Sequence, residues 1–138
     1  MILLDTNVVS ELMRPDPDAK VGSWLAAMDT APLATSAISI AEIVFGLCRL
    51  PDGKRRSSLI ERFDTLLAGP PALPVLALDE QAGRLAGEFH AIRENLGRGS
   101  TPSDMMIAAI AMTHGANLAT RNVGDFSGLP IRVVDPWA

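Results

Sequence analysis

Short apolar runs alternate with segments of helical periodicity, and this alternation constrains the fold more than any other feature. The runs hold only three or four residues, which is too short for helices, so they predict buried strands. These strands are expected at 2–4, 33–35, 75–78, 118–120 and 131–134. Strands that are separated by helices pair most readily as parallel neighbours, because each helix returns the chain to the same edge of the sheet.

Helical periodicity fills most of the chain between the predicted strands. Apolar residues three and four positions apart predict helices over 6–12, 18–29, 38–50, 54–67 and 79–96. Segment 101–114 is apolar nearly all round, so it is expected to be a central helix. The predicted class is therefore α/β: one three-layer α/β/α domain over residues 1–138, with a short, mostly parallel sheet of four to five strands.

Composition excludes several classes of protein. With 12 Lys and Arg against 16 Asp and Glu, the net charge is −4, so bulk electrostatic attraction cannot hold a nucleic acid. The single cysteine, Cys48, excludes an internal disulfide and a multi-cysteine zinc site. The longest apolar run, 105–112, is far shorter than the roughly 18 residues that cross a bilayer, and no targeting segment is visible. We expect a cytoplasmic protein that does not associate with membranes.

Acidic residues stand at positions where a parallel sheet could bring them together. Asp5 directly follows the first predicted strand, Glu42 lies early in the helix after the second, and Asp104 lies in the first turn of the apolar helix. A polar cluster, Thr120-Arg121-Asn122 with Asp125, follows the fourth strand. Ligands bind beyond the carboxyl ends of parallel strands. Oxygen donors without thiols or histidines suit Mg²⁺ or Mn²⁺, and such sites favour phosphoryl chemistry.

Helix capping is the alternative role for two of these acids. Ser39-Ile40-Ala41-Glu42 matches a capping box, and Thr101-Pro102-Ser103-Asp104 comes close to one. An acid at a helix N-terminus contributes about 0.5–1 kcal/mol, and taken singly Glu42 and Asp104 are better explained in this way. Asp5 differs, because a carboxylate directly after a buried strand contributes nothing to stability unless it is paired. The joint pattern favours a functional site, in which mutual repulsion should raise at least one carboxyl pKa.

Four motifs in this order resemble PIN domains, in particular the FitB-like VapC toxins of toxin–antitoxin pairs. They lie at 5–12, at Ser39-x-x-Glu42, at 101–108 and at 119–126, and the likeness extends to the terminal Asp135-Pro136-Trp137. The resemblance implies a Mg²⁺-dependent endoribonuclease, with Mn²⁺ able to substitute, that is inhibited by a cognate antitoxin. Its products would carry 5′-phosphate and 3′-hydroxyl ends.

The resemblance also assigns roles to individual residues. Asp5, Glu42 and Asp104 match the catalytic, metal-binding acids of the family. The fourth acidic position is either Asn122, which carries no charge, or Asp125 three residues later. Residues that would orient the carboxylates or hold water are Thr6, Ser39 and Thr120. Independently of the resemblance, three arginines stand near the predicted strand ends and are candidates for contact with RNA phosphate: Arg93, Arg98 and Arg121.

Partners and alternative functions follow from the same residues. The helix predicted over 38–50 has apolar residues on more than one face, and the resemblance implies a homodimer and an antitoxin whose Arg or Lys enters the acidic pocket. No DNA binding is expected by the chain alone.

The main alternative function is that of a non-catalytic PIN-like interaction domain whose acidic pocket docks a basic peptide. The uncharged Asn122 favours this alternative. An aspartyl-phosphate receiver or phosphatase is disfavoured, because neither Lys20 nor Lys54 follows a later strand.

Overall fold

A five-stranded parallel sheet forms the centre of the computed structural model, which describes residues 1–138. The strand order is β3-β2-β1-β4-β5, so β1 lies between strands from the two halves of the chain. From β1 the sheet extends in one direction to β2 and β3 and in the other to β4 and β5, which places a topological switch point between β1 and β4. The strands are β1 (Ile2–Leu4), β2 (Leu33–Ser36), β3 (Val75–Leu76), β4 (Asn117–Ala119) and β5 (Val133–Val134).

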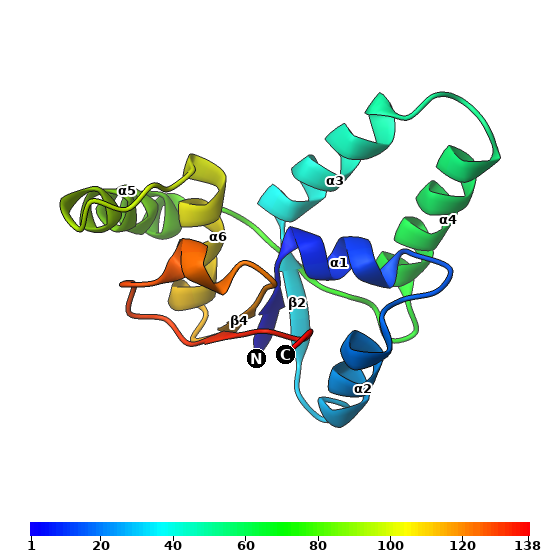
Figure 1. Cartoon of the computed structure of the whole chain (residues 1–138), viewed down its shortest axis with the longest axis horizontal. Coiled ribbons are helices and arrows are strands. Elements are labelled where there is room, and N and C mark those ends of the chain that lie inside the picture. The colour runs from blue at the N-terminus through cyan, green and yellow to red at the C-terminus, as the bar shows by residue number, and fades with distance from the viewer.

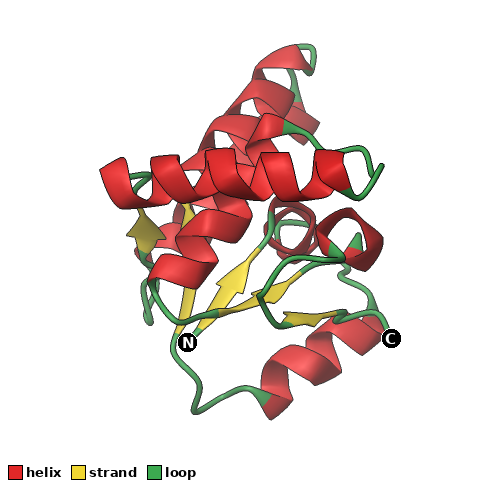
Figure 2. Cartoon of the chain, turned by 90° about the vertical axis from the view of Figure 1, so that its left-hand side faces the viewer, coloured by secondary structure: helices red, strands yellow, loops and turns green.

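Helices cover both faces of the sheet, which confirms the predicted three-layer α/β/α class (Figures 1 and 2). Alternate residues of β1 point to opposite faces: Leu3 packs in one apolar cluster, with α5 and α6, whereas Ile2 and Leu4 pack in the other, with α1, α3 and α4. No helix combines the length and the apolar character needed to cross a membrane. The helices are α1 (Thr6–Leu12), α2 (Ala19–Ala27), α3 (Ala37–Arg49), α4 (Lys54–Ala68), α5 (Glu80–Asn95) and α6 (Pro102–Thr113).

Helix α6 is the most buried helix, as its composition predicts. Met105 and the four residues from Ile107 to Ile110 are almost completely buried, and α6 packs against α5, α3 and β4. Thr101 caps its N-terminus and Pro102 occupies the first turn, where the missing amide hydrogen costs nothing. This packing fixes the start of α6, and therefore Asp104, against the centre of the fold.

Several predicted boundaries were wrong by a few residues. Strand β3 holds two residues, not 75–78, because the chain leaves the sheet before Asp79 caps α5. Strand β5 likewise begins at Val133. Helix α2 lies inside the predicted 18–29, since Asp18 is its N-cap. A short 3-10 helix, η1 (Val123–Phe126), was not predicted, because four residues are too few to show a period.

Candidate active site

The candidate active site lies at the switch point of the sheet, where β1 and β4 end side by side. Leu4 and Ala119 are partners in the parallel register, so Asp5 and Thr120 follow neighbouring strands, as predicted. The Asp5 amide donates to the Ala119 carbonyl at 2.9 Å, and the Thr120 hydroxyl donates to Asp5 Oδ2 at 2.7 Å. The strand pairing therefore holds the first acid of the site through both its backbone and its side chain.

Asp5 also begins α1, so its carboxylate is paired and has a structural role as well. Its Oδ1 accepts from the Thr6 amide at 2.8 Å, and it is the N-cap of the helix. The residue is 4% exposed. Burial raises the pKa of Asp5 most, the hydrogen bonds from Thr120 and Thr6 oppose that rise, and the charges of Glu42 and Asp125 add to it. The two hydrogen bonds thus orient the carboxylate, while burial and the neighbouring negative charges destabilise its ionised form.

Glu42 is held by α1 and does not cap its own helix. Ser36 is the N-cap of α3 and accepts from the Ser39 amide at 3.0 Å, so the capping-box interpretation of Ser39 and Glu42 was wrong. That interpretation placed the cap three residues too late, because the helix starts as soon as β2 ends. The Thr6 hydroxyl donates to Glu42 Oε1 at 2.8 Å and lies 2.9 Å from Ser39 Oγ. Thr6 therefore joins the acid on α3 to the helix that starts at Asp5.

Asp104 makes half of the predicted capping box. Its backbone amide donates to Thr101 Oγ1 at 3.2 Å, but its carboxylate makes no hydrogen bond back to the Thr101 amide. Burial is the largest cause of a raised Asp104 pKa, the Thr101 hydrogen bond lowers it, and the charges of Asp5, Asp125 and Glu42 raise it. The capping interpretation therefore holds for the Asp104 amide, whereas the carboxylate, whose pKa the Thr101 side chain lowers, does not complete the box.

Four carboxylates share one electrostatic environment at this edge of the sheet. Glu42 and Asp125 raise the pKa of Asp5, and the same two residues together with Asp5 raise the pKa of Asp104. In Figure 1 the elements that carry them meet around α1 and the starts of α3 and α6. No three of the acids lie close enough together to surround one ion without side-chain movement. The site is therefore an open acidic cluster whose members repel one another.

Asn122 and Asp125 follow β4 in different settings. The Asn122 amide donates to Thr120 Oγ1 at 3.1 Å, and its side chain makes no hydrogen bond. Asp125 lies in η1 and is exposed, yet its charge reaches both Asp5 and Asp104. Asp125 is therefore the residue of this pair that adds negative charge to the cluster.

The three arginines considered as phosphate contacts differ in exposure. Arg93 is 4% exposed and its guanidinium donates to backbone carbonyls, so it cannot meet a phosphate, and the interpretation of Arg93 as a substrate contact is corrected. Arg98 is exposed and donates to Ser127 Oγ at 2.8 Å. Arg121 is exposed and its guanidinium lies over the Trp137 ring, 5.0 Å from the centroid.

Asn7 belongs to the site and was missed as a site residue. Its Nδ2 donates to Thr120 Oγ1 at 3.3 Å, and its Oδ1 accepts from the Arg121 amide at 3.2 Å. Asn7 thereby holds the loop after β4 against the start of α1. A polar residue two positions after Asp5 was the available signal, but its partners lie more than a hundred residues away in the sequence.

The metal-free protein should carry a pH-dependent stability cost at Asp5 and Asp104. In the folded protein the pKa values of both residues lie above the ordinary value of 3.8, so folding favours their protonated forms. Their contribution to the free energy of unfolding is therefore complete below that pH and is lost as the pH rises through the folded-state pKa values. We expect Asp104→Asn to raise the Tm in EDTA at about pH 7.5 and to raise it less at about pH 4. Thermal unfolding at both pH values measures this difference, and an equal change at both would contradict it.

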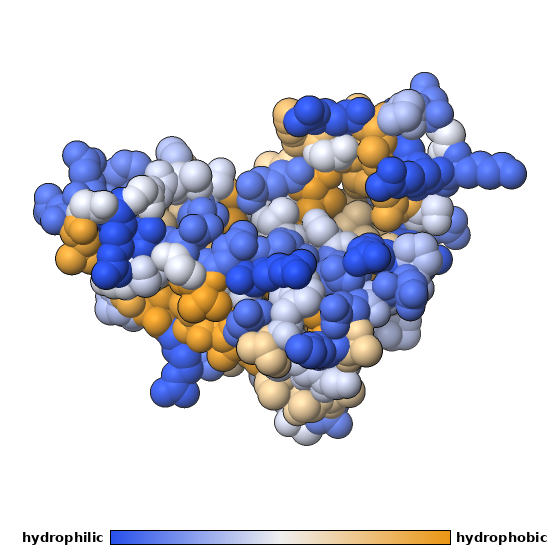
Figure 3. All heavy atoms as spheres, viewed as in Figure 1, coloured by the Kyte–Doolittle hydropathy of each residue, from blue (hydrophilic) through white to orange (hydrophobic).

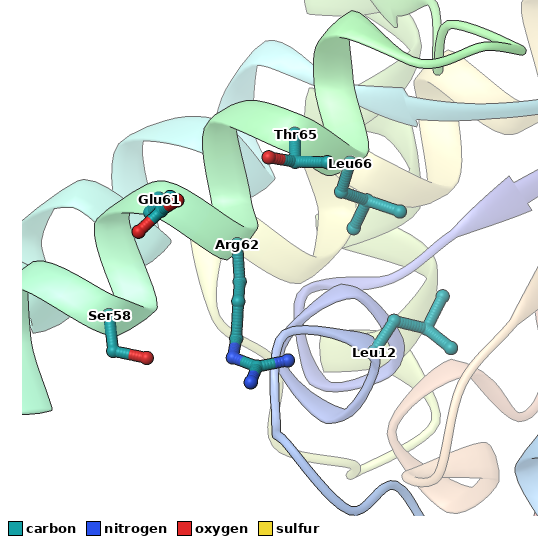
Figure 4. Close-up of a pocket in the computed structure, with 6 residues that line it drawn as sticks. All are labelled: Leu12, Ser58, Glu61, Arg62, Thr65 and Leu66. Atoms are coloured by element: carbon teal, nitrogen blue, oxygen red, sulfur yellow. The ribbon is translucent and has the colours of Figure 1, made fainter.

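A separate hollow lies between α1 and α4, and none of the four acids of the site lines it (Figure 4). Leu12 of α1 lines it together with Ser58, Glu61, Arg62, Thr65 and Leu66 of α4. A larger hollow of about 870 Å³ shares Leu12 and Leu66 and continues past Leu25 and Met28 to the 69–74 loop. The two hollows share Leu12, Thr65 and Leu66, and we call them together the α1–α4 groove; its larger part is mainly apolar.

The fold and the acidic cluster at its switch point define a class: an α/β/α domain whose site brings together carboxylates from four segments of the chain. A family model described as PIN domain matches residues 2–129, and the chain belongs to the PIN domain family. It is 37% identical over 137 residues to the VapC ribonuclease Y4jK of Sinorhizobium fredii, covering 99% of this chain and 98% of that protein. It is 34% identical over 137 residues to the toxin FitB of Neisseria gonorrhoeae, covering 99% of both.

Solved structures agree with the sequence relatives. The chain superposes on a chain of FitAB bound to an IR36 DNA fragment with a TM-score of 0.88 and 34% identity, covering 100% of this chain and 96% of that one. The resemblance to FitB-like VapC toxins is therefore confirmed. The presence of DNA in that assembly is at odds with the expectation of no DNA binding, and we drop that expectation.

Proposed function

We propose that this protein is a Mg²⁺-dependent endoribonuclease, the toxin of a toxin–antitoxin pair. The observation that carries the proposal is the buried Asp5, held by Thr120 at the switch point and coupled electrostatically to Glu42, Asp104 and Asp125. Relatives named ribonuclease, endonuclease and toxin over nearly the whole chain support the same activity. The acid cluster alone does not specify RNA, and the choice of RNA rests on these relatives.

The donor set fits a hard divalent cation. It offers only carboxylate oxygens, and the raised pKa values of Asp5 and Asp104 are those of anions that lack a counter-charge. Asp5, Asp104 and Glu42 would hold the ion, and Asp125 is favoured over Asn122 for the fourth position because it is charged. When bound, Mg²⁺ would lower the pKa of a water molecule and stabilise charge on the phosphoryl oxygens.

Neutral side chains of the protein orient these acids. The Thr120 hydroxyl fixes one oxygen of Asp5, and the Thr6 hydroxyl fixes one oxygen of Glu42. Asn7 holds Thr120 and the following loop in place. The exposed Arg98 and Arg121 are the cations available near this edge for RNA phosphate, and we retain both in that role. The products are expected to carry 5′-phosphate and 3′-hydroxyl ends.

RNA cleavage with and without metal tests this function. Purified protein should cut total RNA with Mg²⁺ or Mn²⁺, and EDTA should abolish the cutting. Ligation-based end analysis should find 5′-phosphates at the new ends. Cleavage that persists in EDTA, or products with 5′-hydroxyl ends, would overturn the metal-dependent mechanism.

The alternative, an acidic docking pocket without catalysis, predicts weak metal binding. The docking function is favoured by the fact that no three of the acids are arranged closely enough to hold a metal ion. Calorimetric titration with Mn²⁺ separates the two functions, because an active centre should bind the ion more weakly as the pH falls and the acids take up protons. A docking pocket should give little heat at any pH.

We further propose that an antitoxin binds the α1–α4 groove with an apolar segment and places a cation in the acidic cluster. The groove offers Leu12, Leu25 and Leu66, and the cluster offers unbalanced negative charge. FitAB assemblies, in which a relative of this chain is found, support a protein partner.

Leu66→Asp should weaken antitoxin binding at least about tenfold, since it would place an unpaired charge in an apolar contact. Ile60→Asp is the matched control, because Ile60 lies on the same helix, is 37% exposed and does not line the groove. Calorimetry with the product of the adjacent gene measures both affinities. Equal effects of the two variants would place the antitoxin elsewhere.

A homodimer is proposed from the α3–α4 hairpin. Val44 and Phe45 are 42% and 53% exposed on α3, where apolar side chains appear among polar ones (Figure 3). An isologous contact would bury them and set two acidic clusters along one surface. Light scattering at tens of micromolar protein measures the mass, and a monomer there would rule the dimer out.

A further inference from the structure

A buried arginine connects two loops that lead to acids of the site. Arg93 lies in the last turn of α5 and is 4% exposed, yet no carboxylate pairs with it. Its Nη1 donates to the Ser127 carbonyl at 2.8 Å, to Ser127 Oγ at 3.0 Å and to the Gly124 carbonyl at 3.2 Å, and its Nη2 donates to the Gly99 carbonyl. Its Nε is buried without a partner.

These contacts link the segments that carry Asp104 and Asp125. Gly124 and Ser127 flank Asp125 in and after η1, and Gly99 stands two residues before Thr101, the N-cap of the helix that carries Asp104. Ser127 Oγ also donates to the Gly124 carbonyl at 3.0 Å, which closes the turn around Asp125. One planar side chain therefore joins the backbones that place two of the four acids.

Interaction with the end of its own helix does not account for this arrangement. A cation in the last turn of a helix can interact with the helix's own terminal carbonyls, but the Arg93 guanidinium donates to three carbonyls that all belong to other segments. Burying a cation without an ion-pair partner costs free energy, which three carbonyls and a hydroxyl offset. A lysine has one nitrogen in place of the guanidinium fork and cannot reach both segments in the same way.

We propose that Arg93 is a positioning residue that sets the distance between Asp104 and Asp125, and through it the affinity of the acidic cluster for a divalent cation. This inference rests on the proposed function. It assigns no direct contact between Arg93 and metal or RNA. It predicts that Arg93 acts only where Asp125 is present to be positioned.

A double-mutant cycle on Mn²⁺ affinity tests the coupling. Arg93→Lys should weaken Mn²⁺ binding about tenfold by calorimetry, as losses in the shell around metal ligands do, and should add no further loss in the Asp125→Asn background. Arg84→Lys is the control: Arg84 lies on the same helix, is exposed and pairs with Glu80 at 3.0 Å. Ser127→Ala keeps the Arg93 charge and removes three hydrogen bonds of the Ser127 hydroxyl, those from Arg93 and Arg98 and the one to the Gly124 carbonyl. It should give a smaller loss of Mn²⁺ affinity than Arg93→Lys, and Arg98→Lys measures the share that belongs to Arg98, so the pair serves if Arg93→Lys fails to fold.

Hydrogen exchange in the metal-free protein supplies a second readout. Arg93→Lys should speed exchange of the amides in 97–104 and 122–128 together and leave β1 and β2 unchanged. Equal Mn²⁺ losses in the two backgrounds, or faster exchange in only one of the two segments, would overturn the proposal. If the wild-type protein neither cleaves RNA nor binds Mn²⁺, the proposed function fails, and the exchange result still decides whether Arg93 couples the two segments.

Discussion

Asp5→Asn is expected to lower the rate of Mg²⁺-dependent RNA cleavage about a thousandfold while leaving the protein folded. The acid loses the charge that would hold the cation, which is worth several kcal/mol of transition-state stabilisation, and each 1.36 kcal/mol is a factor of ten. Asparagine can still cap α1 and can still accept from the Thr120 hydroxyl, so the two structural contacts of Asp5 can persist. Initial rates on a fluorescent RNA measure the effect.

Asp79→Asn provides the matched control for this prediction. Asp79 is the N-cap of α5 and accepts from the Ala82 amide at 2.8 Å, but it lies at the start of another helix and does not shift the pKa of Asp5 or Asp104. Both variants remove one negative charge from a helix cap. Comparable activity of the two variants would show that Asp5 acts as a cap and not as a catalytic acid.

Thr120→Val is expected to weaken Mn²⁺ binding about 10- to 100-fold, although valine has nearly the same shape as threonine. The residue is fully buried, and its hydroxyl donates to Asp5 and accepts from Asn7 and from the Asn122 amide. Loss of the hydroxyl frees the Asp5 carboxylate to rotate and removes a bond that lowers its pKa, so protons should compete better with the metal. Calorimetry at about pH 6 and pH 8 should show the larger loss at the lower pH.

Thr35→Val separates this effect from a loss of stability. Thr35 is also fully buried at the end of a neighbouring strand, but its hydroxyl donates to the Leu4 carbonyl at 2.9 Å. Thr35→Val removes one buried hydrogen bond, which contributes about 1 kcal/mol to the free energy of unfolding, whereas Thr120→Val removes the three hydrogen bonds of its hydroxyl. Only Thr120→Val should change Mn²⁺ affinity, and a similar loss in both variants would assign the effect to the sheet as a whole.

The fold could be predicted because local patterns specified most of it. The short strand Ile2–Leu4, the proline-started helix α6 and the intervening amphipathic helices each carry a signal within a few residues. Parallel pairing then follows from the alternation of strands and helices. The N-cap of α3 was assigned to the wrong residue because Ser36 and Ser39 are both acceptable caps in sequence, and only the end of β2 decides between them.

The site could be predicted in part, for a related reason. Asp5, Glu42 and Asp104 stand at fixed places relative to strand ends and helix starts, so the class of fold was enough to suggest that they meet. Asn7 and Arg93 depend on which loops touch, and that is a property of the tertiary structure. Arg93 was misinterpreted because its position near a helix end says nothing about whether its charge faces water or carbonyls.

The bond between Thr120 and Asp5 joins residues 115 positions apart, and this separation has a consequence for the timing of activity during synthesis. The polypeptide is synthesised from the N-terminus onward. Asp5, Thr6 and Glu42 therefore leave the ribosome long before Thr120 and Asp125 do. Until β4 inserts beside β1, the nascent chain lacks the partner of its first acid and one side of the cluster. If the proposed ribonuclease activity requires the assembled cluster, we expect it to arise only when synthesis is nearly complete.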